Sequence, residues 1–146
     1  MNDYDTAEGR GQDMLGAGNG LPYTLAYRVS TILMNMGVMQ HLRGYRYLRD
    51  AIILVIRNGM NFCSMSRDVY PQIARAYGTS TTAVDLAMRH AIDVAWICSG
   101  GDTMQRFFGA AVTQSLKPSN ALFVHAVAER ISAETYREMA AELKVL

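Results

Sequence analysis

The sequence is poor in the residues that mark secreted, membrane-spanning and metal-clustered proteins. It has 2 cysteines, 3 prolines and 1 tryptophan among 146 residues. Cys63 and Cys98 form neither a disulfide framework nor a Cys-x-x-Cys pair. The longest uncharged apolar run, residues 51–56, is far too short to cross a bilayer, and residues 2–20 are polar and acidic, unlike a signal peptide. We therefore expect a soluble domain that makes no contact with a membrane.

An excess of charge of one sign is also missing. The net charge is +1, much weaker than the strongly basic balance of many nucleic-acid binders. The small total hides an asymmetry, because residues 1–20 carry 4 acidic side chains against Arg10, whereas residues 21–146 carry 13 basic and 9 acidic ones. Charge alone thus neither indicates nor excludes a nucleic-acid partner.

Apolar residues, by contrast, make up 50% of the chain, and a chain of this length can bury a sizeable core without disulfides or metals. Residues 1–20 hold five glycines and predict a flexible acidic tail. Residues 21–131 predict one helical domain. Residues 132–146 predict a C-terminal amphipathic helix, whose apolar face could pack on the same chain or on a second copy.

Helical periodicity dominates from residue 21 onward, and glycine, proline and an Asn-Gly pair mark the breaks. The predicted helices cover residues 21–36, 45–57, 66–77, 80–98, 102–108 and 121–131, ahead of the C-terminal one. We find no internal repeat and no strand pattern. The expected fold class is all-α, a bundle of about six helices containing a helix-turn-helix and unrelated to the winged helix.

The joint between the third and fourth predicted helices has the spacing of a helix-turn-helix. Ala74 is small where two steeply crossed helices touch, Gly78 can adopt a positive φ, and Val84 is an apolar anchor in the second helix. Hydroxyl residues suited to N-capping and to phosphate contacts fill the turn: Thr79, Ser80, Thr81 and Thr82. The same spacing also occurs between ordinary packed helices.

The helix over 80–98 divides into two faces. Its expected inward residues are Val84, Ala87, Met88, Ala91, Ala95 and Cys98, and its outward residues are Thr82, Asp85, Leu86, Arg89 and Asp93. In a major groove, Arg89 could bind guanine and Leu86 could contact a thymine methyl group. Asp85 could accept a hydrogen bond from cytosine or orient Arg89. The alternative is a solvated helix face.

Five stretches in chain order carry a resemblance to a known family. They are residues 41–52 (His-Leu-Arg-Gly-Tyr-Arg-Tyr-Leu-Arg-Asp-Ala-Ile), 69–74 (Val-Tyr-Pro-Gln-Ile-Ala), 88–96 (Met-Arg-His-Ala-Ile-Asp-Val-Ala-Trp), Phe108-Gly109 and 117–120 (Lys-Pro-Ser-Asn). Residues 36–131 resemble the DNA-binding effector domain of the stage 0 sporulation protein A family. The resemblance implies an all-helical domain of the bacterial cytoplasm whose helix-turn-helix reads double-stranded DNA, usually as tandem copies.

Carried over by position, the resemblance places four residues where the family contacts DNA: Thr82, Asp85, Arg89 and His90. Asp85 takes the place of a base-contacting glutamate and Arg89 that of a base-contacting arginine. The chain departs from the family at Ala83 and Leu86, where arginines are usual. Thr79, Ser80, Leu86 and Lys117 complete the expected DNA-binding set, with Lys117 a backbone contact at a helix start or a plain loop lysine.

The resemblance also bears on regulation and partners. Residues 99–112 match the region that touches the RNA polymerase sigma subunit, although Arg106, Phe107 and Ala110 differ there. The residues before Met36 are too few for a receiver domain, so we expect no switching by phosphorelay. A homodimer or a tandem dimer on DNA is the expected assembly.

No catalytic residue, metal or cofactor is expected, because His41, His90 and His125 lack ligand spacing with each other or with the cysteines. The leading prediction is a sequence-specific DNA-binding transcriptional regulator with no enzyme activity. The alternative is a protein-interaction module that keeps the fold and has little or no specific DNA binding.

Overall fold

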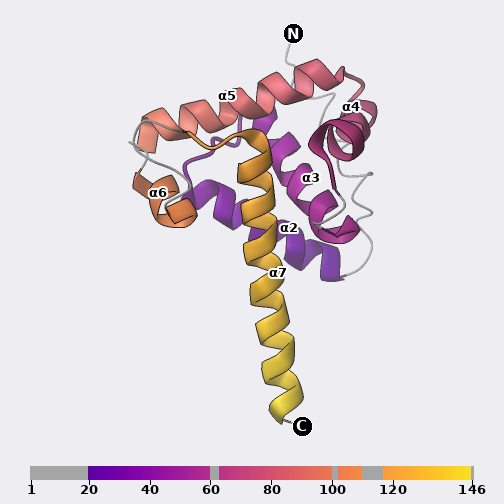
Figure 1. Ribbon diagram of the computed structural model, residues 1–146, viewed down its shortest axis with the longest axis vertical. Helices are drawn as coiled ribbons and strands as arrows, with labels where there is room; N and C mark the ends of the chain where they lie inside the picture. The colour runs from indigo at the N-terminus through magenta and orange to yellow at the C-terminus, as the bar shows by residue number, and fades with distance from the viewer. Residues whose placement is uncertain (1–19, 60–62, 100–101, 110–116, 146) are drawn as a thin grey trace.

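The computed structural model describes residues 20–59, 63–99, 102–109 and 117–145. All regular elements within these ranges are helical, which confirms the all-α prediction (Figure 1). The elements are α2 (Gly20–Asn35), α3 (Arg43–Asn58), a π-helical turn η2 (Met65–Val69), α4 (Tyr70–Tyr77), α5 (Thr81–Ser99), α6 (Asp102–Phe108) and α7 (Asn120–Val145).

Helix α3 is the centre of the bundle and packs against α2, α4, α5 and α7. It buries a nearly continuous set of residues: Gly44, Tyr45, Tyr47, Leu48, Asp50, Ala51, Ile52, Ile53 and Val55. Helix α5 lies across the N-terminal end of α7, and the C-terminal part of α7 runs away from the body (Figure 1). One end of the molecule is therefore formed by α5 and the other by the end of α7.

A glycine lets α3 and α5 cross in close contact. A Cβ atom placed on Gly44 would lie 2.1 Å from the carbonyl oxygen of Ala87 and 2.6 Å from the Cβ of Ala91. Such distances leave no room for a side chain, so the two backbones touch here. The crossing fixes α5 on the body of the domain with its opposite face turned away from α3.

A buried carboxylate joins α3 to α4. Asp50 is fully buried, and its Oδ2 accepts a hydrogen bond of 2.6 Å from the Tyr77 hydroxyl, while its Oδ1 accepts one of 3.1 Å from Arg49 Nε. Burial raises the pKa of the Asp50 carboxyl above its usual range, although Arg49 and Tyr77 act in the opposite direction. The pKa of Tyr77 is raised as well, chiefly by burial and then by the Asp50 charge.

The structure corrects three expectations. The segment expected over 66–77 begins as the π-helical turn η2, capped by Ser64, whose hydroxyl accepts from Arg67 N–H at 3.4 Å. The helix expected over 121–131 and the C-terminal helix are one helix, α7, because no glycine or proline interrupts residues 120–145. Cys98 is exposed, not inward, because the buried face of α5 ends at Ala95, one turn earlier.

The other expected boundaries agree closely with the structure. Pro71 lies in the first turn of α4 as expected, and Gly37, with φ of 85°, follows the end of α2. Ser119 opens α7 because its hydroxyl accepts from Leu122 N–H at 3.1 Å. The tail expected over residues 1–20 lies outside the described residues except for Gly20. Within the described residues no helix is long and apolar enough to span a membrane.

Candidate nucleic-acid interface

The turn between α4 and α5 is closed by main-chain hydrogen bonds. Gly78 has φ of 65° and ψ of 40°, the left-handed conformation that the sequence predicts for it. The Thr79 N–H donates to the carbonyl oxygen of Ala74 at 2.9 Å, and the Gly78 N–H to that of Arg75 at 3.4 Å. This pair of bonds is a Schellman motif, which ends α4 and turns the chain sharply.

The start of α5 is then fixed by Ser80. Its hydroxyl oxygen accepts a hydrogen bond of 3.1 Å from Ala83 N–H, so Ser80 is the N-cap residue. The small residue Ala74 and the anchor Val84 are both buried where the two helices meet. The geometry of a helix-turn-helix is thus present at the expected residues.

The two faces of α5 differ as expected. Its buried residues are Val84, Met88, Ala91, Ile92 and Ala95, and Ala87 packs against this core from a half-buried position. On the opposite face, Leu86 is 54% exposed and the Arg89 side chain 60% exposed. Thr82 and His90 are exposed as well. The outer face of the N-terminal half of α5 is therefore accessible to a large partner.

Asp85 is the most constrained residue of this face. Its Oδ1 accepts hydrogen bonds of 3.0 Å from the Tyr70 hydroxyl and of 3.0 Å from Asn120 Nδ2. Its Oδ2 accepts one of 3.1 Å from Arg89 Nη2, an i to i+4 ion pair along the helix. Both carboxylate oxygens therefore have partners within the protein, and one of those partners is the arginine expected to bind a base.

The support beneath Asp85 comes from two other helices. Tyr70 begins α4, and Asn120 begins α7 and is buried. Asn120 Nδ2 also donates to the Tyr70 hydroxyl at 3.1 Å and to the Asp85 carbonyl oxygen at 3.0 Å. Burial raises the pKa of Tyr70, so its hydroxyl stays protonated and can donate at neutral pH. Helices α4, α5 and α7 thus share one polar cluster: Tyr70, Asp85, Arg89 and Asn120.

Sequence reasoning on function did not assign a role to Tyr70 or Asn120. Both residues lie inside the stretches that carry the family resemblance, Tyr70 in Val-Tyr-Pro-Gln-Ile-Ala and Asn120 in Lys-Pro-Ser-Asn. A polar residue within a resembling stretch was therefore the available signal. Their partner Asp85 is 15 and 35 residues away in the chain, a separation at which spacing predicts no contact.

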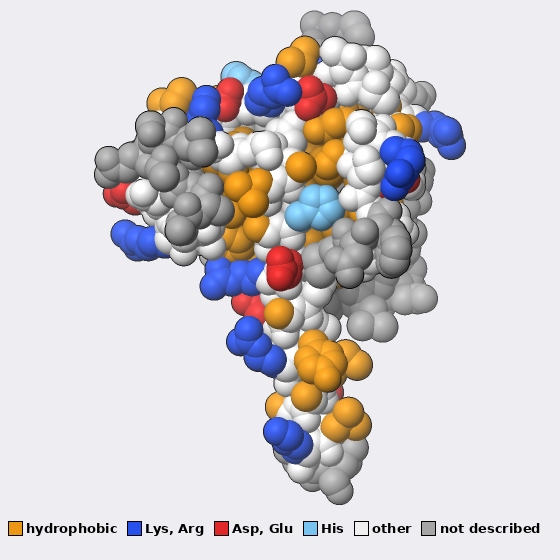
Figure 2. Space-filling view, in the orientation of Figure 1, with side chains coloured by type: hydrophobic (Ala, Val, Ile, Leu, Met, Phe, Trp, Pro, Cys, Tyr) orange, Lys and Arg blue, Asp and Glu red, His pale blue; other side chains and the backbone are white. Residues whose placement is uncertain are grey.

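The electrostatics of the outer face are balanced. Arg89 pairs with Asp85, and Lys117 Nζ lies 2.9 Å from Asp93 Oδ1. In Figure 2, Lys and Arg side chains alternate with Asp and Glu side chains along the edge over α5. Two of the expected DNA-binding cations are thus each held by a carboxylate of the same helix, α5. Any anionic partner has to compete with those two carboxylates or to share the cations with them.

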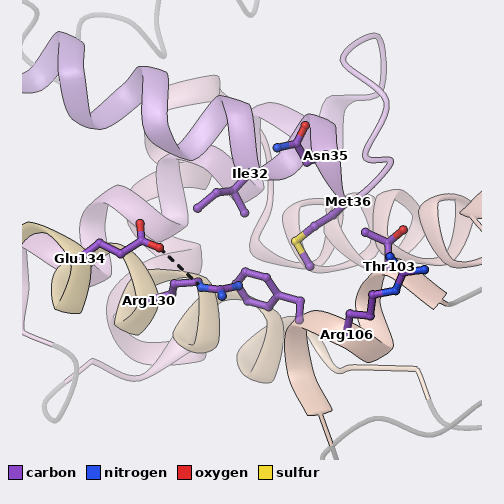
Figure 3. A pocket seen from close by; sticks show the side chains of 8 residues that line it. Ile32, Asn35, Met36, Thr103, Arg106, Arg130 and Glu134 are labelled. Atoms are coloured by element: carbon purple, nitrogen blue, oxygen red, sulfur yellow. Dashed lines mark ion pairs between the residues drawn. The ribbon is translucent and has the colours of Figure 1, made fainter.

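A hollow lies away from this face, between α2, α6 and α7 (Figure 3). It encloses about 380 Å³ and is partly lined by Arg106 and Arg130. The Arg130 guanidinium stacks over the Phe107 ring at 4.6 Å and lies 3.7 Å from Glu134. None of the expected DNA-binding residues lines this hollow. Within the described residues no cluster of His, Cys, Asp and Glu has the geometry of a metal site.

A comparison with known protein families finds a match over the region that holds this site. A family model described as "Sporulation initiation factor Spo0A C terminal" matches residues 29–131. The match includes α3, the whole helix-turn-helix and the N-terminal part of α7, and it ends at Ile131, the last buried residue of α7. The chain therefore belongs to the family of Spo0A C-terminal domains, the DNA-binding effector domains of sporulation regulators.

Proposed function

We propose that this protein is a sequence-specific DNA-binding transcriptional regulator that reads the major groove with the N-terminal half of α5. The observation that carries the proposal is the exposed outer face of α5, held on the body by the Gly44 crossing and preceded by a helix-turn-helix joint. A helix presented in this way has the shape and the accessibility that major-groove recognition needs.

Arg89 is the proposed base reader. A guanidinium has five N–H donors, and only its Nη2 atom is committed to Asp85, which leaves donors for the O6 and N7 atoms of guanine. Asp85 acts as a positioning residue in this arrangement, because Tyr70 and Asn120 hold its other oxygen. Of the two roles that the sequence leaves open for Asp85, the hydrogen bonds support the orientation of Arg89.

The remaining residues of the set have simpler proposed roles. Leu86 offers an apolar contact to a thymine methyl group, and Thr82 and His90 flank it on the exposed face. The Thr79 and Ser80 hydroxyls lie at the turn, where they can donate to phosphate oxygens. Lys117 completes the set as a phosphate contact, which competes with Asp93 for the ammonium group or shares it.

An unbiased selection from random DNA duplexes at near-physiological salt tests the proposal. We expect an enriched motif that Arg89→Ala abolishes, with a loss of about 1–3 kcal/mol in binding free energy at the base pair it reads. Arg106→Ala is the matched control, because it removes the same charge from α6 and should leave the motif intact. Folded protein that enriches no motif would refute the proposal.

The balanced charge of the outer face favours one alternative function, a protein-interaction module. Its two paired cations and the 54% exposed Leu86 would suit a protein partner better than a polyanion. Under this alternative, Leu86→Asp abolishes binding of a protein partner while DNA selection enriches nothing. The two functions are thus separated by the same folded protein in two assays.

We also propose the RNA polymerase sigma subunit as a protein partner at residues 99–112. Helix α6 provides Arg106 and Phe107 there, and Ala110 lies outside the described residues. Arg106 is exposed, whereas Phe107 is half-buried beneath Arg130. A crosslinking reagent placed at residue 106 should capture the sigma subunit on promoter DNA, and its failure to do so would refute this contact.

A further inference from the structure

The hollow between α2, α6 and α7 has the size of a small-molecule site. It encloses about 380 Å³, and ligand-binding pockets have volumes of about 300–1,000 Å³. Ile32 of α2, Met36 just after α2 and Phe107 of α6 give it an apolar wall. Met36 is 2% exposed and belongs to the hydrophobic core, so the packing of the domain holds this wall in place.

The charged side chains of the hollow leave one cation without a counter-charge. Arg130 stacks over the Phe107 ring at 4.6 Å and lies 3.7 Å from Glu134, so these two charges compensate each other. Arg106 is exposed and has no hydrogen-bond or ion-pair partner within the residues that the structure describes. The lining therefore has a formal charge of +1, and the uncompensated part is the Arg106 guanidinium.

The polar groups of the hollow gather at two ends. In Figure 3, Thr103 and Arg106 lie at one end and Arg130 and Glu134 lie at the other, with Met36 between them. Thr103 precedes Arg106 by three residues on α6, which places both on one side of that helix. One end of the hollow thus offers a hydroxyl and a guanidinium to a ligand, next to an apolar wall.

A comparison with the groove between α2, α3 and α7 shows what is particular to this hollow. The groove is larger, at about 570 Å³, and it is lined by apolar residues such as Leu25 and Ile56. Its Arg28, however, already forms an ion pair with Glu138. An anion entering the groove would have to break that pair, whereas an anion entering the hollow meets Arg106 without a competing carboxylate from the described residues.

We propose that the hollow binds a small organic monocarboxylate. The carboxylate accepts hydrogen bonds from Arg106 and Thr103, and the apolar body lies against Met36 and Phe107. A guanidinium can donate two parallel N–H bonds to a carboxylate, and the single negative charge matches the +1 of the lining. A dianion such as a phosphate monoester would bring an uncompensated negative charge into a hollow that also contains Glu134.

Methyl NMR on the full chain, with isotopically labelled methionines and no DNA, tests the proposal. The probes are hexanoate and hexanamide, which have nearly the same shape and differ in charge. We expect the Met36 methyl resonance to shift saturably with hexanoate, at a dissociation constant about fivefold lower than that for hexanamide. Equal dissociation constants, or no saturable shift at Met36, would overturn the proposal.

Variants of the lining assign the preference for the anion. Arg106→Gln should remove the fivefold difference between the two probes, because the amide keeps polar atoms and loses the charge. Arg137→Gln is the matched control, since Arg137 is an exposed arginine of α7 outside the hollow and its loss should leave the difference intact. A difference that survives Arg106→Gln, or one that Arg137→Gln also removes, would overturn the assignment to this site.

A third probe, hexyl phosphate, tests the class of anion. At a pH where it is a dianion, we expect weaker binding than that of hexanoate, and Glu134→Gln should reduce the gap between the two. Tighter binding of hexyl phosphate to the wild type would overturn the assignment to monocarboxylates. The inference is independent of the proposed function, because none of the expected DNA-binding residues lines the hollow. A failed DNA selection therefore leaves the titration result standing, and a failed titration leaves the DNA-binding proposal standing.

Discussion

The inner and outer faces of α5 meet different requirements. The inner face is apolar, fully buried at Val84, Met88 and Ala91, and in backbone contact with α3 at Gly44. The outer face is exposed, and its Asp85 and Arg89 are paired with each other. Side chains on the inner face determine where the helix lies, whereas side chains on the outer face determine what the helix binds.

This difference bears on the two departures from the family pattern that the sequence predicts. The stretch over residues 88–96 includes the buried residues Met88, Ala91, Ile92 and Ala95, which cannot change without a rearrangement of the core. The departures at Ala83 and Leu86 lie off the fully buried face. Leu86 is exposed, so an altered residue there costs the fold little. The outer face is therefore the part of the domain in which specificity can change.

The largest expected effect breaks the inner face. Gly44→Ala places a methyl group 2.1 Å from the Ala87 carbonyl oxygen and should lower the free energy of unfolding by about 3 kcal/mol or more. In an unobstructed helix the same change would raise it by about 0.5–1 kcal/mol, because alanine has the higher helix propensity. Chemical denaturation of the wild type and of Gly44→Ala shows whether the free energy of unfolding falls or rises. A stabilised variant would show that α3 and α5 do not cross in close contact.

The next largest effect concerns the hydrogen bonds that hold Asp85 against the rest of the domain. Asn120→Ala removes the amide that donates to Asp85 and to Tyr70, and it should lower the free energy of unfolding by about 1–3 kcal/mol. DNA affinity should fall as well, because Asp85 no longer holds Arg89 in one position. Asn35→Ala is the control, since Asn35 is exposed at the end of α2. A destabilised variant with unchanged DNA discrimination would show that Asp85 does not position the reader.

A smaller effect concerns the DNA affinity of the outer face of α5. Leu86→Arg places at an exposed position the residue type that the family resemblance predicts there. It should strengthen DNA binding about tenfold while leaving the free energy of unfolding within about 0.5 kcal/mol. If the new arginine contacts a phosphate, the slope of log affinity against log salt steepens by about one. Ile97→Arg adds the same charge elsewhere on α5. An equal gain from both variants would assign the effect to net charge.

The smallest effect is a pH dependence of the free energy of unfolding that comes from Asp50 in α3. Burial raises the pKa of Asp50 above the usual 3.8, so the folded chain binds this proton more tightly than the unfolded chain does. The free energy of unfolding therefore falls as the pH rises above that value, and Asp50→Asn removes this contribution. Denaturation at several pH values should show the variant gaining stability relative to the wild type as the pH rises.

Asp68 provides a control of opposite sign. The hydrogen bond from Arg67 lowers the pKa of the Asp68 carboxyl, and the Ser64 N–H acts in the same direction. Its contribution to stability is therefore present above 3.8 and is lost as the pH falls through the lowered value. Asp68→Asn should lose stability relative to the wild type as the pH rises. Equal slopes for the two variants would contradict the difference in burial between the two carboxylates.

Local signals were enough to predict the fold and the joint of the candidate site. Periodicity and breaker residues gave the bounds of α6, and the left-handed Gly78 and an N-cap hydroxyl within residues 79–82 follow from the chemistry of short turns. The structure identifies Ser80 as that residue. The exposure of Leu86 and Arg89 follows from helical geometry once Val84 is placed inward. These features depend on residues within a few positions of each other.

Features that depend on distant partners were not predictable in the same way. Cys98 has the helical phase of the inner face, yet it is exposed, because the buried face of α5 ends at Ala95. The cluster around Asp85 joins three helices, and no spacing rule connects residues 70, 85 and 120. The continuity of α7 was missed because the residues around 132 change from a buried to an exposed environment, which resembles the start of a new element.

Helix α7 is unbroken from Asn120 to Val145. It therefore fixes the directions of its side chains around the helix axis as well as their separation along it. Without a proline or glycine to act as a hinge, the direction of the Tyr136 side chain is set by the same rod that places the Asn120 amide beneath Asp85. One residue inserted near position 132 would swing everything beyond it by about 100° around the axis, and seven would nearly restore the original heading. The length of this segment is therefore constrained by helical phase, because Thr135 and Glu138 must still face Arg28 of α2.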